Sequence, residues 1–124
     1  MSCQSKNYLL LLHGYTQDGS KVKKRVADWM GKSNLKKYTV YSPDGKYQIS
    51  PKDISQGKGW WHLPSPDKFS QPHTYLPTSI IESEFQEFKL LFNEIKKENS
   101  DSHVFILGFS QGACLVHHLL LREA

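Results

Sequence analysis

The sequence predicts an α/β fold with a three-stranded parallel sheet and helices on both faces. Three short apolar runs have the length and composition of strands, each precedes a segment with helical spacing, and the third run leads into a Gly-x-Ser-x-Gly turn. Strands that alternate with helices form βαβ units, whose right-handed crossovers place helices against a parallel sheet. The 124 residues suffice for one small domain, but a usual α/β enzyme is longer.

The first half of the chain supplies two of these strands. Tyr8–Leu12 is a continuous apolar run too short for a buried helix, which indicates a strand buried on both faces. Tyr38–Tyr41 is β-branched and aromatic, and the proline-containing turn 42–45 follows it. Between the strands, apolar residues at helical spacing predict a helix that ends near Gly31; its apolar stripe is Val22, Val26, Trp29 and Met30.

Residues 46–77 have no hydrophobic period and predict a long loop. Loops of this length are usually functional or disordered, and four aromatic rings favour a loop that docks on the domain: Trp60, Trp61, Phe69 and Tyr75. Ser79 and Glu82 then form a predicted capping box, and a helix continues to about Lys97. The apolar stripe of this helix is Ile81, Phe85, Phe88, Phe92 and Ile95.

The third predicted strand, Val104–Leu107, runs into Gly108-Phe109-Ser110-Gln111-Gly112 and then into a helix from Gln111 to about Arg122 that is apolar on most sides. This context predicts a nucleophile elbow, in which a sharp strand-to-helix turn lifts the hydroxyl of Ser110 clear of its surroundings in a strained backbone conformation. A side chain at Gly108 or Gly112 would crowd the strand against the helix.

Two backbone amides are candidate donors to an oxyanion beside Ser110. Gln111 lies in the first helical turn, where amides lack helical acceptors. The second donor is expected in the loop after the first strand, where Tyr15 is the first candidate and Thr16 the second. His13 precedes this loop, and we expect it to order the loop by hydrogen bonding rather than to act as a base.

These features together resemble the FSH-type serine hydrolases of the α/β-hydrolase fold. The residues that carry the resemblance are Leu12-His13-Gly14, Gln17-Asp18-Gly19, the Trp60-Trp61 pair and Gly108-Phe109-Ser110-Gln111-Gly112-Ala113. The last segment is also similar to the elbow of acyl-protein thioesterases and small carboxylesterases. The resemblance implies hydrolysis of an acyl ester or thioester, with Ser110 as nucleophile, Tyr15 and Gln111 as oxyanion donors, Trp60 and Trp61 near the acyl pocket, and no cofactor. The tryptophans could equally serve only to pack the loop onto the sheet.

The resemblance covers the N-terminal half of such a hydrolase, so residues 1–124 are expected to form a partial domain. In α/β-hydrolases the acid and the histidine follow the elbow helix, and no Asp or His follows it here. We therefore expect this chain alone to be inactive. The strand before Ser110 should also be an exposed edge through which the chain could self-associate. A non-catalytic interaction half-domain is the alternative function.

Other classes of function have weaker signals. Gly14–Lys21 approaches a phosphate-binding loop, but Ser20 and Lys21 stand in swapped order and Asp18 would face the phosphate. The histidines lack metal-ligand spacing. The net charge of +4 comes largely from lysines of the first helix and the segment after it, which indicates a solvated face and no nucleic-acid partner. The absence of a membrane span and a signal peptide and the two separate cysteines, Cys3 and Cys114, predict a cytoplasmic protein with reduced thiols.

Overall fold

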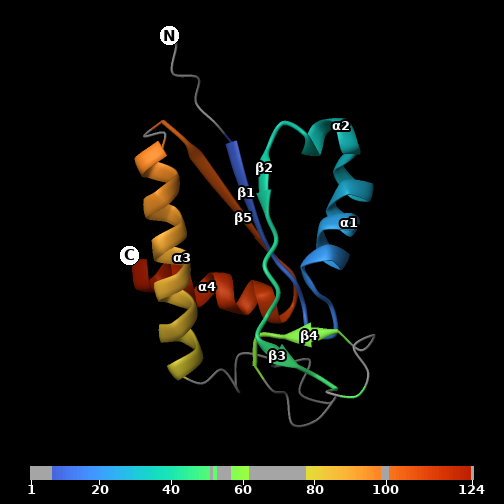
Figure 1. The fold of residues 1–124 in the computed structure, drawn as a ribbon, viewed down its shortest axis with the longest axis vertical. Coiled ribbons are helices and arrows are strands. Elements are labelled where there is room, and N and C mark those ends of the chain that lie inside the picture. The colour runs from blue at the N-terminus through green and yellow to red at the C-terminus, as the bar shows by residue number, and fades with distance from the viewer. Residues whose placement is uncertain (1–6, 51, 53–56, 62–77, 99–100, 124) are drawn as a thin grey trace.

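The structure is a computed structural model that describes residues 7–50, 52, 57–61, 78–98 and 101–123. Its centre is a three-stranded parallel sheet in the order β2-β1-β5, with β1 at Asn7–Leu12, β2 at Thr39–Tyr41 and β5 at His103–Gly108 (Figure 1). The predicted parallel sheet is confirmed, including the central place of the first strand. All three strands run toward the end of the molecule where the loops of the candidate site lie (Figure 1).

Strand β1 supplies core residues to both faces of the sheet. Its residues Tyr8–Leu12 are all buried, as expected of a strand with a neighbour on each side and helices above and below. Successive side chains of a strand point to opposite faces. Leu9 and Leu11 accordingly belong to one core cluster, and Leu10 and Leu12 belong to the other.

Helices α1 (Gly19–Met30) and α2 (Lys32–Leu35) cover the first face (Figure 1). Val22 and Val26 of α1 are fully buried against Leu9 and Leu11. The side chain of Asp18 caps α1 by accepting a hydrogen bond of 2.9 Å from the Lys21 amide. The short helix α2, which the sequence analysis did not predict, follows directly after Gly31 and buries Leu35 in the same cluster.

Helices α3 (Thr78–Glu98) and α4 (Gln111–Glu123) cover the second face (Figure 1). Phe88, Leu115 and Leu119 are buried there around Leu10 and Leu12. The predicted capping box is wrong, because α3 already includes Thr78 and Ser79 is therefore an exposed residue inside the helix and not its cap. Of the predicted stripe of α3, the side chain of Ile81 lies outside the described residues.

The predicted loop 46–77 contains a small second sheet. Strands β3 (Tyr47–Gln48) and β4 (Lys58–Gly59) pair antiparallel, and Gln17 forms a further bridge with Lys58. Each of these strands is only two residues long, so neither produces a hydrophobic period that could be detected in the sequence. Phe69 and Tyr75 lie outside the described residues.

Several large apolar side chains of the predicted helices, one of them in the predicted stripe of α1, are exposed. Trp29 is 74% exposed, and Leu120 and Leu121 are more than half exposed. Trp29 borders a hollow of about 390 Å³ beside Leu107 and Phe109. Strand β5, whose Leu107 and Gly108 line the hollow, is an edge strand among the described residues. Within those residues, no helix is long and apolar enough to cross a membrane.

Candidate active site at the carboxyl ends of the strands

Ser110 lies in the turn between β5, which ends at Gly108, and α4, which begins at Gln111. The backbone φ of Ser110 is +53°, a left-handed value that is uncommon and strained for a residue other than glycine. Its side chain is exposed. The predicted position and backbone strain of Ser110 are therefore confirmed.

The turn around Ser110 is packed too tightly for larger residues at its glycines. A Cβ atom on Gly108 would lie 2.6 Å from the Cα of Ala113, and one on Gly112 would lie 2.2 Å from the carbonyl oxygen of Leu12. The Phe109 amide donates a hydrogen bond of 3.0 Å to the same Leu12 oxygen. The turn that carries Ser110 therefore packs closely against the end of β1, and only glycine fits at positions 108 and 112.

His13 is a fully buried residue that organises the loops around the turn. The Gly45 amide donates to its Nε2 at 2.7 Å, so Nδ1 carries the proton and donates to the Gly14 carbonyl at 2.8 Å. The imidazole also stacks on the Trp60 ring with the ring centroids 5.0 Å apart. Burial lowers the pKa of His13, against a smaller opposing effect of the Gly14 hydrogen bond. A neutral histidine with both nitrogens engaged orders the loop, as the sequence predicts, and does not serve as a base.

The loop after β1 lies directly beside Ser110. A Cβ atom on Gly14 would come within 3.3 Å of the Ser110 Cβ. The Gly14 amide donates to Gln17 Oε1 at 2.8 Å, and the Thr16 amide donates to the Lys58 carbonyl at 3.0 Å. Thr16, the second candidate oxyanion donor, is therefore excluded because its amide is already used. Tyr15 lies between Gly14 and Thr16 in the chain, and its ring stacks on the Tyr47 ring with the centroids 6.4 Å apart.

Trp60 and Trp61 are both 2% exposed and form part of the core. The Trp60 indole donates to the His13 carbonyl at 2.8 Å, which joins the loop after β4 to the loop after β1. The side chain of Gln111 holds the backbone of both tryptophans: Oε1 accepts from the Trp60 amide at 2.6 Å, and Nε2 donates to the Trp61 carbonyl at 2.9 Å. The sequence predicts a role only for the backbone amide of Gln111, because a fully buried glutamine side chain cannot be recognised from its sequence position.

No described residue reaches the Ser110 hydroxyl as a base. No hydrogen bond joins this hydroxyl to a histidine or a carboxylate within the described part of the chain. His117 and His118 lie on α4, where their rings contact each other edge to face with the ring centroids 6.0 Å apart. The thiol of Cys114 is free, and burial raises its pKa, which disfavours the reactive thiolate.

The alternative of a phosphate-binding loop lacks an anion site. The carboxylate of Asp18 already occupies the amino end of α1, where it accepts a hydrogen bond from the Lys21 amide. A phosphate would have to approach this negative charge. Among the described residues, no group of three or more His, Cys, Asp or Glu side chains could hold a metal ion.

The fold and the position of Ser110 define the class of protein, which is an α/β protein of the serine hydrolase type. The family model described as "Serine hydrolase (FSH1)" matches residues 1–123, so the chain belongs to the FSH1 serine hydrolase family. This membership supports a hydrolase-type function in general. No curated protein and no solved structure matches the chain significantly.

Proposed function

We propose that this domain hydrolyses acyl esters or thioesters through a covalent acyl intermediate on Ser110. The observation that carries the proposal is the strained, exposed position of Ser110 between β5 and α4, at the carboxyl end of a parallel sheet. A serine in such a turn can attack a carbonyl carbon without obstruction from its own backbone. The Ser110 oxygen would bond to the acyl carbon while the alcohol or thiol leaves with a proton, and water would then release the acid.

Two backbone amides are proposed to stabilise the tetrahedral intermediate. Gln111 is the first residue of α4, so its amide has no helical acceptor and lies at the positive end of the helix dipole. The Tyr15 amide would approach from the loop after β1, which lies against Ser110 at Gly14. Loss of either donor should raise the barrier by about 3 kcal/mol.

We propose an indirect role for the two tryptophans that the family resemblance places near the acyl pocket. Both side chains are almost entirely buried, and Gln111 holds their backbone beside Ser110. They would shape the inner wall of the acyl pocket. They would contact the substrate little, because almost none of their surface is open.

A serine nucleophile needs a base, and the described residues bring none to Ser110. We therefore propose that residues outside the described ranges supply the base and its acid. Because α/β-hydrolases carry both partners after the elbow helix, we also propose that the 124 residues alone have negligible activity. The same observation favours a second candidate, a non-catalytic interaction half-domain that associates through β5. The cytoplasmic location expected from the sequence stays a prediction.

The decisive experiment uses a fluorophosphonate probe, which bonds covalently to activated serines. The 124-residue chain and any longer form of the protein would be labelled in parallel with their Ser110→Ala variants, and the labelled peptide would be mapped by mass spectrometry. Ser83→Ala is the matched control because Ser83 is an exposed serine on α3.

We expect labelling of Ser110 in a longer form, loss of the label in Ser110→Ala, and no change in Ser83→Ala. Absence of label from Ser110 in every form would refute the hydrolase proposal and leave the interaction domain. Stabilisation by a nucleotide would instead revive the phosphate-binding loop.

A further inference from the structure

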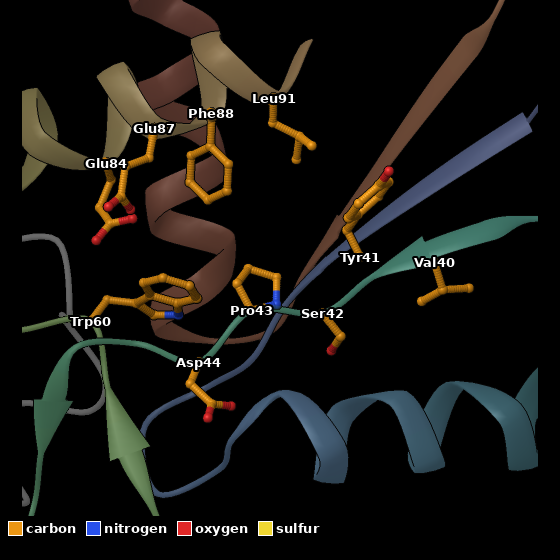
Figure 2. A pocket seen from close by; sticks show the side chains of 10 residues that line it. All are labelled: Val40, Tyr41, Ser42, Pro43, Asp44, Trp60, Glu84, Glu87, Phe88 and Leu91. Atoms are coloured by element: carbon orange, nitrogen blue, oxygen red, sulfur yellow. The ribbon is translucent and has the colours of Figure 1, made fainter. Parts of the chain in front are cut away.

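A cavity of about 380 Å³ lies between α3 and the segment that continues from β2 (Figure 2). Its volume is within the range of small-molecule sites, roughly 300–1,000 Å³. Three aromatic residues line it, Tyr41, Trp60 and Phe88. Figure 2 shows the Phe88 ring projecting from α3 toward the segment that carries Pro43, with the Trp60 ring below it.

The charged side chains that line the cavity are all acidic: Asp44, Glu84 and Glu87. Asp44 is already engaged, since its carboxylate accepts from the Gly19 amide at 2.7 Å and pairs with Lys58 at 3.2 Å. Glu84 and Glu87 share a single cation, Lys46, which does not itself line the cavity. Two carboxylates and one ammonium leave this group one positive charge short.

The shortage falls on Glu84. Lys46 Nζ lies 2.6 Å from Glu87 Oε1 but 3.9 Å from Glu84 Oε1, and the Glu84 side chain is only 5% exposed. Burial raises the pKa of Glu84 to about 7, the charge of Glu87 and a hydrogen bond with the Glu87 side chain add to this effect, and Lys46 acts in the opposite direction. Below this pKa the Glu84 proton is shared with Glu87, so the shortage of positive charge arises only above about pH 7, where both carboxylates are ionised. A buried carboxylate is costly unless it is closely paired, and Glu84 has no close cationic partner of its own among the described residues.

We propose that this cavity binds the ammonium group of a small organic cation, with Glu84 as its counter-ion, the half-buried ring of Tyr41 as its open wall and the almost fully buried rings of Trp60 and Phe88 behind it. A cation near Glu84 would supply the missing charge, and aromatic faces attract cations through their quadrupoles. A quaternary ammonium fits best, since it needs no hydrogen-bond acceptors and its methyl groups suit apolar walls.

This inference does not depend on the reactivity of Ser110. Trp60 separates the cavity from the loop after β1, because its ring stacks on His13 and lies 6.5 Å from Phe88 on its cavity side. Ser110 does not line the cavity. A bound cation would therefore contact the wall that adjoins the candidate active site without occupying the site itself.

The test is a binding titration of the purified protein, followed by NMR chemical shifts at pH 8. The probes are choline and benzyltrimethylammonium, and the charge control is 3,3-dimethylbutan-1-ol, a neutral analogue of choline with the same shape. We expect saturable binding of both cations, shift changes at Trp60 and Phe88, and at least about tenfold weaker binding of the alcohol. Binding of neither cation, or equal binding of the alcohol, would overturn the proposal.

Variants locate the site. Glu84→Gln keeps the side-chain shape and should weaken cation binding by about tenfold or more, whereas Glu94→Gln makes the same charge change at an exposed position of α3 and should alter it less than about twofold. Equal effects of the two substitutions would contradict a local role for Glu84. If Glu84→Gln does not fold, Leu91→Trp provides the second test by filling the cavity from α3. Undiminished cation binding by Leu91→Trp would also refute the site.

Discussion

The side-chain oxygen of Gln111 lies 2.6 Å from the backbone nitrogen of Trp60, and the side-chain nitrogen Nε2 of Gln111 donates a hydrogen bond to the Trp61 carbonyl. The first residue of α4 thereby joins the turn at Ser110 to a loop about 50 positions earlier in the chain. The hydrogen bond from the Trp60 indole to the His13 carbonyl adds the loop after β1. Three segments at the carboxyl end of the sheet are thus held by one buried network.

Replacement of Gln111 by alanine should destabilise the fold by roughly 2–4 kcal/mol, because it leaves the Trp60 amide and the Trp61 carbonyl buried without partners. Urea denaturation measures this loss, and tryptophan fluorescence should shift to longer wavelength as water reaches the indoles. Gln86→Ala is the control, since Gln86 is an exposed glutamine on α3. A loss no larger than in Gln86→Ala would show that the link contributes nothing to stability.

In the folded protein His13 should remain neutral, with its proton on Nδ1, at pH values just below 6.5, where a histidine in an unfolded chain is already protonated. Burial lowers the folded-state pKa, so the unfolded state binds more protons as the pH falls below about 6.5. The contribution of His13 to stability is therefore complete above pH 6.5 and is lost as the pH falls toward its folded-state pKa. Nitrogen-15 chemical shifts of the imidazole report both tautomer and charge. A protonated ring in the folded protein at pH 6.5 would disprove this assignment.

Glu84 should have the opposite effect on the pH dependence of stability. Its pKa is raised from 4.5 to about 7 in the folded state, so the folded protein binds more protons between these values. Stability from this group is present below pH 4.5 and is lost as the pH rises through 7, by up to about 3 kcal/mol. Urea denaturation at pH 5 and pH 8 should show a smaller decrease in Glu84→Gln than in the unchanged protein. Glu94→Gln should retain the full decrease, and a Glu84→Gln profile identical to it would exclude Glu84 as the source.

The 124-residue chain should self-associate through β5, which is an edge strand among the described residues. Phe105 on this strand is 49% exposed, and unpaired strand edges with apolar side chains pair readily with other chains. Sedimentation should show dimers or larger species, and Phe105→Lys should shift them toward monomer because a charged side chain on an edge opposes pairing. Leu90→Lys on α3 is the control, because Leu90 is also exposed but lies on a helix and not on the strand edge. A monomer at all concentrations would show that the edge is covered.

The sequence alone determined the elements whose patterns are local. The continuous apolar run of β1, the stripe of α3 and the glycines around Ser110 each reflect a requirement set within a few residues, so the parallel sheet and the strand-to-helix turn could be predicted. Glu84 also left a signal that could have been noticed, since it precedes Phe88 by four residues and so lies on the apolar face of its helix.

Only the tertiary structure decided what depends on contacts between distant segments. It placed Trp60 and Trp61 in the core, gave the Gln111 side chain its partners, used the Thr16 amide in a bond to Lys58 and left Trp29 exposed beside β5. None of these follows from periodicity, because a buried polar side chain is stabilised by whichever backbone groups folding brings to it. The exposure of an apolar side chain likewise depends on which element packs over it, and this is fixed by the order of strands in the sheet.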